Sequence, residues 1–175
     1  SIGELMVRGD VVTRQYVTRT DQNALHKVED GDTFWHRMGD VGYLDEHDRF
    51  WCCGRKSQRV RTAHGELFTE PCEAIFNNHP AIHRTALVGL GAPPQQEPII
   101  VAEPWGEQRP KDEAASQTLV EQLLELGCKS ELTNGIRRVL LYPKRLPTDI
   151  RHNSKIFREE LATWAAQQIS KTKGG

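Results

Sequence analysis

Short apolar runs, separated by glycine or polar turns, dominate the first 57 residues of the chain. Residues 3–8 alternate in hydrophobicity with period two, and residues 34–38, 41–44 and 49–53 are further short runs of this kind. Such runs are typical of β-strands, whereas residues 24–28 favour a short helix. This part is therefore predicted to be β-rich. Its aromatic residues are expected to form the sheet core: Phe34, Trp35, Tyr43, Phe50 and Trp51.

Strand and helix patterns alternate irregularly through the rest of the chain. Thr69 precedes Glu-Pro, which predicts a helix with Thr69 as its N-cap. Leucines and aromatic residues recur at helical spacing near residue 120 and near residue 161. We expect strands near 59–61, 66–68, 85–90, 98–103 and 138–142, and helices over 69–77, 112–126 and 155–169. The alternation predicts an α+β fold, a small sheet with packed helices.

A polar segment separates the two patterns. Residues 54–59 read Gly-Arg-Lys-Ser-Gln-Arg and hold no apolar side chain, which favours an exposed connector. We therefore place a domain boundary after Ser57, giving domains 1–57 and 58–175. The chain also opens inside a predicted strand without a lead-in. We expect it to be the C-terminal part of a longer protein.

The charge balance argues against nucleic acid as a partner. Lys and Arg total 23, Asp and Glu total 24, and the formal net charge is −1. Nucleic-acid binders usually carry a clear basic excess. We also find no run of 18 apolar residues and no basic-then-apolar leader, so we expect neither a membrane span nor a signal peptide.

The cysteines and histidines do not have the spacing of a metal site. Of the four cysteines, Cys52 and Cys53 are adjacent and no C-x-x-C pair occurs, so neither a zinc site nor a disulfide framework is indicated. His79 and His83 are four residues apart, but Pro80 lies between them and disfavours one helix carrying both. We expect buried or idle thiols, no metal ligand and a cytoplasmic location.

Two charged residues follow glycines near the ends of predicted strands. Asp40 comes after Gly39 at a predicted turn, where its carboxylate either accepts hydrogen bonds from a vicinal diol such as ribose or only caps its own turn. Arg55 follows Gly54 and offers a planar fork of donors for hydroxyls or phosphate. The alternative for Arg55 is a solvated basic linker.

Lys155 lies at the start of the last predicted helix. Asn153 or Ser154 can cap that helix, which places Lys155 in the first turn, where a cation opposes the helix dipole by roughly 0.3–1 kcal/mol. A residue that violates its local preference indicates a functional role. The alternative is a surface lysine that extends into water.

In their order along the chain, these segments resemble those of the adenylate-forming enzymes, which comprise acyl-CoA synthetases, luciferases and the adenylation domains of peptide synthetases. The resemblance covers nearly the whole chain. The matching segments are Gly3 to Gly9 with Tyr16, Gly39-Asp40, Gly54-Arg55, Glu66 to Glu73, and Asn153 to Ile156.

The resemblance implies a C-terminal lid domain, preceded by a β-rich remnant of a large N-terminal domain. It implies that Asp40 and Arg55 hold the AMP ribose, that Ser57 is the hinge, and that Lys155 is catalytic and contacts the acyl-adenylate and the leaving pyrophosphate. ATP and Mg²⁺ are then bound mainly by the N-terminal domain, so the fragment alone is expected to be inactive.

Three positions depart from the family pattern. Met38 stands where the family has Thr, Ser57 stands at a hinge usually occupied by Asp or Lys, and Ser154 replaces the Gly before the lysine. The glycine-rich phosphate loop and the adenine-binding aromatic segments do not occur in this chain. In the family they lie upstream of the segment that matches Gly3, which agrees with a C-terminal fragment.

Three longer segments look most like the bacterial β-lactone synthetases of olefin biosynthesis: HRMGDVGYLD (36–45), ELFTEPCEAIFN (66–77) and DIRHNSKIFREELATWA (149–165). That subfamily implies activation of a long-chain, β-hydroxy fatty acid as acyl-AMP, closure to a β-lactone and release of AMP. The implied partners are the acid, the enzyme's own N-terminal domain and other enzymes of the olefin pathway.

Two other functions stay open. In a fatty acyl-CoA or acyl-AMP ligase, coenzyme A would displace AMP in place of the substrate's own hydroxyl. From a different class, a non-catalytic interaction module would use a basic groove to bind a partner protein. The residues of that groove would be Arg55, Lys56, Arg59 and Arg61.

Overall fold

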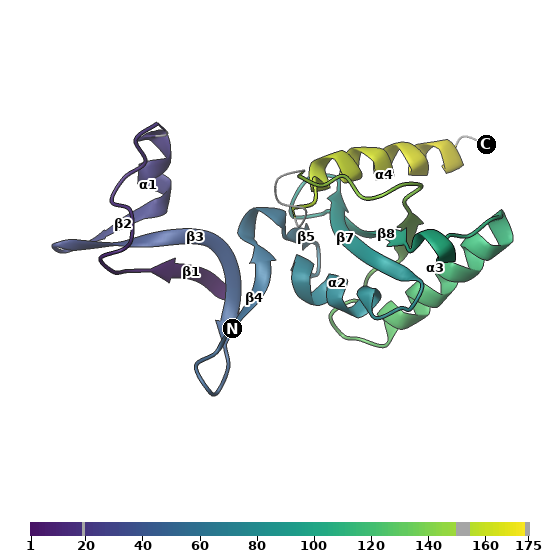
Figure 1. Ribbon diagram of the computed structural model, residues 1–175, viewed down its shortest axis with the longest axis horizontal. Coiled ribbons are helices and arrows are strands. Elements are labelled where there is room, and N and C mark those ends of the chain that lie inside the picture. The colour runs from purple at the N-terminus through teal and green to yellow at the C-terminus, as the bar shows by residue number, and fades with distance from the viewer. Residues whose placement is uncertain (19, 150–154, 174–175) are drawn as a thin grey trace. The chain divides into compact units, whose positions relative to one another are not determined.

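The computed structural model describes residues 1–18, 20–149 and 155–173 (Figure 1). The chain divides into two compact units, Ser1–Ser57 and Gln58–Gly175, which we call the first and the second unit. The division falls at the boundary drawn from the sequence. That the two units are the end of one domain and a lid stays a prediction.

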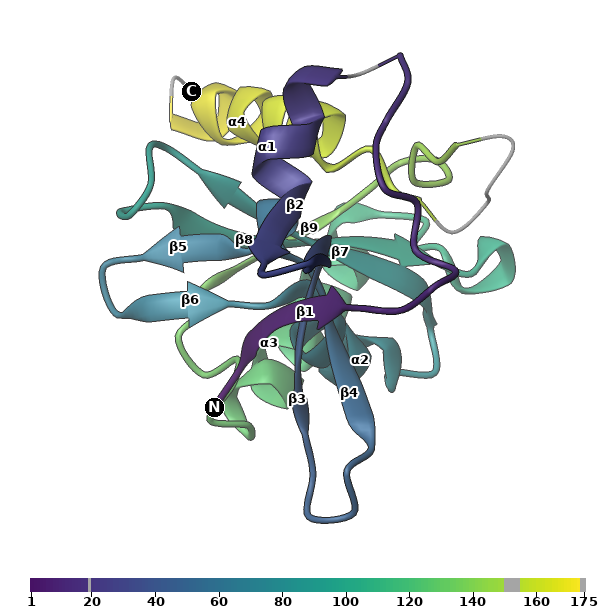
Figure 2. The same cartoon turned by 90° about the vertical axis from the view of Figure 1, so that its left-hand side faces the viewer.

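The first unit is built on an antiparallel four-stranded sheet. Its central strand β3 pairs with the other three, and β3 and β4 run side by side to a short connecting loop (Figure 2). Two short helical segments, η1 and α1, precede β2. The bounds are β1 Gly3–Val7, η1 Thr20–Gln22, α1 Asn23–His26, β2 Lys27–Asp30, β3 Thr33–Leu44 and β4 Phe50–Arg55.

Three predictions for this unit were wrong. The two strands expected on either side of Gly39 form one strand, because Gly39 adopts a φ of +73° and accommodates a bulge opposite β1. Asp40 therefore lies within β3 and not at a turn. The helix expected over 24–28 covers only Asn23–His26 and is followed by β2, which was not predicted.

The expected aromatic core was also wrong for three of its members. Tyr43, Phe50 and Trp51 keep 41%, 38% and 51% of their surface exposed. The buried apolar side chains of this unit are the smaller Val41 and Cys53. A thin sheet without a packed second layer cannot cover large aromatic rings.

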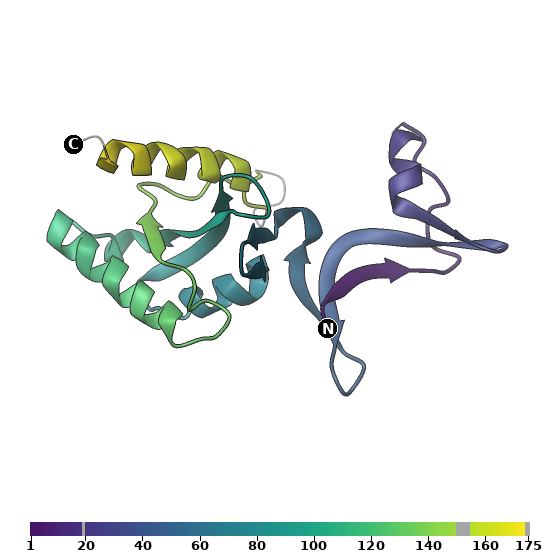
Figure 3. The same ribbon diagram turned by 180° about the vertical axis from the view of Figure 1, so that it is seen from behind.

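The second unit has three layers, with helices on both faces of a three-stranded sheet in the order β7-β8-β9 (Figures 1 and 3). Strands β7 and β8 are antiparallel, and β8 and β9 are parallel. A separate two-stranded sheet, β5 and β6, follows η2. The bounds are η2 Lys56–Gln58, β5 Val60–Thr62, β6 Gly65–Leu67, α2 Thr69–Asn77, β7 Ile82–Leu90, β8 Glu97–Pro104, η3 Gly106–Gln108, α3 Glu113–Cys128, β9 Arg138–Leu141 and α4 Arg158–Lys173.

Alternate residues of the sheet belong to two hydrophobic clusters, one on each face of the sheet. Leu87 and Ile100 pack with Phe76 of α2 and Leu123 of α3 on one face. On the other face, Val88, Ile99 and Val101 pack with Leu161 and Ala165 of α4. Buried strands with helices on both faces carry apolar residues on both sides. The predicted α+β fold is confirmed.

Two predicted helix starts differ from the structure. Thr69 is not the N-cap of α2 but its first, buried residue, and Phe68 precedes it. The helix α4 begins at Arg158 and not at Lys155, because the backbone around Ile156 pairs with Thr148 in an antiparallel bridge. Lys155 therefore does not sit in a helical turn, and the dipole argument does not apply to it.

The proposed caps Asn153 and Ser154 lie outside the described residues. In the part of the chain that the structure describes, no helix combines the length and the hydrophobicity needed to cross a bilayer.

Candidate functional site

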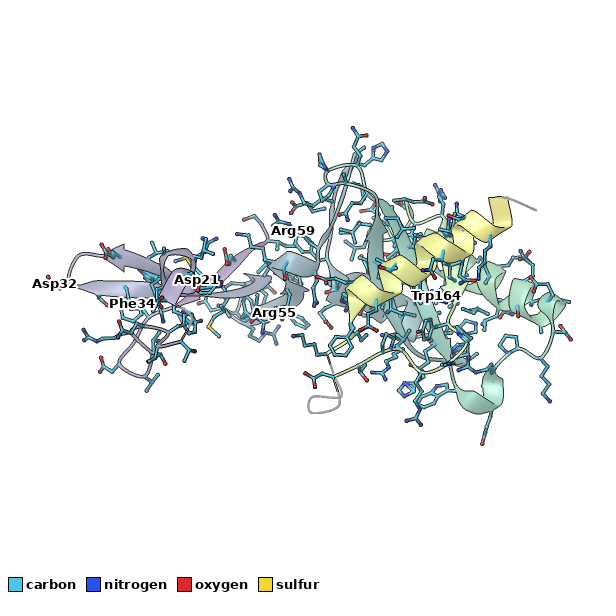
Figure 4. All side chains as sticks on the ribbon, turned by 90° about the horizontal axis from the view of Figure 1, so that it is seen from above. Asp21, Asp32, Phe34, Arg55, Arg59 and Trp164 are labelled. Carbon is cyan, nitrogen blue, oxygen red and sulfur yellow. The ribbon has the colours of Figure 1, made fainter. Side chains whose placement is uncertain are left out.

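Asp40 and Arg55 face each other across two neighbouring strands. They are register partners of β3 and β4, and the Nε atom of Arg55 lies 3.1 Å from Oδ1 of Asp40. The Nη1 atom of Arg55 also donates to the carbonyl oxygen of Met38 at 2.8 Å. Arg55 is the last residue of β4, where Figure 4 labels it. The structure thus brings together the two residues that were predicted separately as ribose ligands.

The pair is accessible to solvent, and the Asp40 carboxylate can accept further hydrogen bonds. The side chains of Asp40 and Arg55 are 26% and 57% exposed. Among the described residues, Oδ2 of Asp40 has no hydrogen-bond partner. A carboxylate has about four lone-pair positions, so Asp40 can hold Arg55 and still accept hydrogen bonds from two adjacent hydroxyls. This chemistry fits a vicinal diol.

A carboxylate missed by the sequence reasoning anchors the connector to the first unit. Oε2 of Glu4 accepts hydrogen bonds from Nε and Nη2 of Arg37 and, at 2.7 Å, from Nζ of Lys56. The hydrogen bond from Arg37, followed by that from Lys56, lowers the pKa of the Glu4 carboxyl against the opposing effect of burial. Lys56, the residue before Ser57, is therefore fixed to β1.

Ser57 lies between two anchored residues. It is the exposed middle residue of η2. Lys56 on one side bonds Glu4 within the first unit, and Gln58 on the other accepts a hydrogen bond from Nε of Arg158 within the second unit at 3.2 Å. The hinge role of Ser57 remains a prediction.

Lys155 is exposed and stands just outside a short backbone bridge. Its carbonyl oxygen accepts from the N–H of Asp149, and the N–H of Phe157 donates to the carbonyl oxygen of Pro147, both at 2.9 Å. Among the described residues, the amine of Lys155 makes no ion pair. Lys155 belongs to the second unit and Asp40 and Arg55 to the first, so the structure joins only the latter two.

A buried ion pair lies directly after Lys155. Glu73 of α2 is 6% exposed, and its two carboxylate oxygens accept from Nη1 and Nη2 of Arg158. Oε1 of Glu73 also accepts from the N–H of Leu87 at 2.7 Å. Burial raises the pKa of the Glu73 carboxyl, and Arg158 opposes that rise. Sequence reasoning missed this pair because its members are 85 positions apart, although both lie within segments that it had singled out, 66–77 and 149–165.

Each of the four members of the proposed basic groove has a carboxylate partner. Arg55 pairs with Asp40, and Lys56 pairs with Glu4. Arg59 and Arg61 both approach Oε1 of Glu66, at 3.2 and 3.5 Å. Glu66 is shared by two cations, and Glu4 is shared by Lys56 and Arg37, so these pairs reduce the positive charge of the groove without cancelling it.

The described ranges contain no cluster of side chains suited to bind a metal ion. No group of three or more His, Cys, Asp or Glu side chains in residues 1–18, 20–149 and 155–173 could hold a metal ion. Cys53 and Cys72 are buried, Cys52 and Cys128 are exposed, and none of these four described cysteines forms a disulfide.

Comparison with known proteins supplies the family. The chain is 44% identical over 173 residues to an olefin beta-lactone synthetase of Xanthomonas campestris, which covers 95% of this chain and 30% of that protein. It is 41% identical over 175 residues to the olefin beta-lactone synthetase of Stenotrophomonas maltophilia, covering 97% and 31%. Over nearly its whole length, the chain is similar to enzymes of the adenylate-forming superfamily. The resemblance to the β-lactone synthetases is confirmed.

The chain is also similar to proteins that carry the name of a different activity. A 4-chlorobenzoate–CoA ligase of Arthrobacter is 31% identical over 178 residues, covering 98% of this chain and 31% of the ligase. The chain thus spans about a third of the length of these curated relatives. No family model matches it.

Solved structures of adenylate-forming enzymes share the fold. An amide bond synthetase from Marinactinospora thermotolerans superposes with a TM-score of 0.73 at 22% identity, covering 94% of this chain and 31% of that structure. The o-succinylbenzoate coenzyme A synthetase of Bacillus subtilis, solved with ATP and magnesium ion, has a TM-score of 0.72 at 20% identity over 92% and 30%. These neighbours confirm the predicted architecture.

Proposed function

We propose that this chain is the C-terminal part of an ATP-dependent enzyme that activates a long-chain β-hydroxy fatty acid as acyl-AMP and closes it to a β-lactone. The observation that carries the proposal is the 44% and 41% identity, over nearly the whole chain, to two olefin beta-lactone synthetases. The Asp40–Arg55 pair supports it, since its geometry fits the ribose of AMP.

The first step joins the acid to AMP. A carboxylate oxygen of the fatty acid attacks the α-phosphorus of ATP, and the bond to pyrophosphate breaks. Negative charge builds on the phosphoryl oxygens, and a cation placed against them stabilises that charge more in the transition state than in the ground state. We assign this cation to Lys155, whose amine has no competing ion pair among the described residues.

The ribose contacts hold the adenylate in place. Asp40 accepts hydrogen bonds from the ribose hydroxyls, and Arg55 keeps the Asp40 carboxylate oriented while offering donors of its own. The described residues offer no ligand set for Mg²⁺. We therefore assign the ion and the triphosphate mainly to the N-terminal domain, and we derive no step through the metal.

The second step releases AMP. The β-hydroxyl oxygen of the substrate attacks the acyl carbonyl carbon, the bond to AMP breaks, and the hydroxyl proton leaves to a base or to solvent. Both reacting groups belong to one molecule, so proximity favours ring closure without a second substrate. Rotation about Ser57 between the two steps would present another face of the second unit.

Product analysis with and without coenzyme A tests the proposal. The full-length enzyme receives ATP, Mg²⁺ and a long-chain β-hydroxy acid, and mass spectrometry and NMR follow the products. We expect a four-membered lactone and AMP in equal amounts under both conditions. A thioester that forms only with coenzyme A, and no lactone, would instead favour the ligase, which the 31% identity to a CoA ligase keeps as the second candidate.

A further inference from the structure

Arg158 uses every nitrogen of its guanidinium in hydrogen bonds. Nε donates to Oε1 of Gln58, Nη1 to Oε1 of Glu73 and to the carbonyl oxygen of Leu87, and Nη2 to Oε2 of Glu73. The side chain is 12% exposed. A planar fork with partners at all three nitrogens has one orientation, which an ammonium group could not reproduce.

This anchor acts on the segment that carries Lys155. Arg158 follows Lys155 by three residues, a distance of at most about 10 Å of extended chain. Between them, Ile156 packs against the hydrophobic cluster beside α4, and Phe157 donates its N–H to Pro147. The backbone that follows Lys155 is thus held by the bridge at Ile156 and, two residues further on, by the guanidinium of Arg158.

The same guanidinium contacts the first residue after the hinge position. Gln58 follows Ser57 directly and opens the second unit. Glu73 is nearly buried and holds the guanidinium toward Gln58. One rigid group therefore joins the start of the second unit to the base of the Lys155 segment.

We propose that Arg158 is a positioning residue for Lys155, held in place by Glu73 and coupled through Gln58 to the hinge. This inference rests on the proposed function of Lys155 and deepens it. When the second unit turns about Ser57, the coupling makes the Lys155 segment follow as part of one body.

The kinetic test removes the coupling with the smallest possible change. In the full-length enzyme, Gln58→Ala deletes one hydrogen bond at a half-buried site. We expect kcat of acid-dependent pyrophosphate exchange to fall by about tenfold, since a displacement of about 1 Å at a reacting group can cost a hundredfold. KM for ATP should stay unchanged, because the ribose ligands Asp40 and Arg55 lie in the other unit. Arg158→Lys should lower kcat further.

Gln96→Ala is the matched control. Its side-chain oxygen accepts from the N–H of Arg61 at 3.0 Å within the same unit but does not contact Arg158. We expect wild-type kcat and KM for this variant. Equal kcat losses in Gln58→Ala and Gln96→Ala, or a loss confined to KM, would overturn the inference.

Amide hydrogen exchange separates this inference from the proposed function. In the 175-residue chain, the N–H of Phe157 should exchange faster in Gln58→Ala and Arg158→Lys than in the wild type and in Gln96→Ala. If exchange is faster in these two variants but the wild-type enzyme is inactive, the proposed function is wrong and the anchoring by Arg158 still holds. If exchange of the Phe157 N–H is unchanged in Gln58→Ala and Arg158→Lys, the inferred anchoring is wrong, whatever the enzyme's activity.

Discussion

Replacing Glu73 with Gln should strongly destabilise the second unit. The substitution keeps the size of the side chain and an acceptor for the N–H of Leu87, but it removes the charge that balances Arg158. The side chains of Arg158 and Glu73 are only 12% and 8% exposed, so water cannot replace the lost partner. Removal of one member of a buried ion pair costs about 3–5 kcal/mol of unfolding free energy.

Urea denaturation followed by circular dichroism at 222 nm measures this loss. The signal reports the second unit, because α2, α3 and α4 have 9, 16 and 16 residues whereas α1 has four. With a denaturant slope of about 2 kcal/mol/M, the transition midpoint should fall by about 2 M. The variant Glu73→Gln/Arg158→Gln should recover part of the loss, because no unpaired charge remains.

Glu97→Gln provides the control for that measurement. Glu97 pairs with Arg138 at 3.0 Å, but both side chains are 40% exposed or more. An exposed pair contributes about 0–1 kcal/mol. If Glu73→Gln lost less than about 1 kcal/mol, like this control, the argument that the buried pair holds α2 to α4 would be refuted.

Three further predictions address the loop, the core and the activity of the fragment. The indole of Trp51, then the backbone N–H groups of Arg49 and His47, lower the pKa of Asp45 from 3.8 to about 2. The stabilisation by the Asp45 carboxylate is therefore complete above the pKa of the unfolded chain and is lost as the pH falls through about 2. An NMR titration midpoint near 3.8 would contradict this. Leu123→Ala, at a fully buried position, should cost about 2–5 kcal/mol of unfolding free energy in urea, and a loss below that of an exposed leucine would contradict the core assignment. The 175-residue chain alone should release no pyrophosphate from ATP with β-hydroxy acids, and clear turnover would refute the assignment of the triphosphate to another domain.

Features with a local signature could be predicted from the sequence. The predicted ranges agree within a few residues with the bounds of β7, β8, α2 and α3. These elements depend on the spacing of apolar residues and on turn residues within the same segment. The family resemblance implied that Asp40 and Arg55 reach the same ribose, but their direct pairing was not predicted; it follows from the antiparallel register of β3 and β4. The resemblance to the family also followed from motif order.

Features that depend on distant contacts could not be predicted. Gly39 resembles a turn residue, and only the pairing of β3 with β1 shows that it is a bulge within one strand. Asn153 and Ser154 suggested helix caps before Lys155, but Ile156 pairs with Thr148 in a bridge and the helix begins only at Arg158. The Glu73–Arg158 pair likewise joins elements 85 positions apart.

Acid-dependent pyrophosphate exchange by the full-length enzyme with Lys155→Ala tests the central claim most directly. Lys155 is exposed, so its removal should cost less than about 0.5 kcal/mol of stability. Loss of one transition-state charge contact should slow exchange by about a hundredfold or more. Lys144→Ala, at another exposed lysine of the second unit, should keep the wild-type rate. Wild-type exchange by Lys155→Ala would contradict the account.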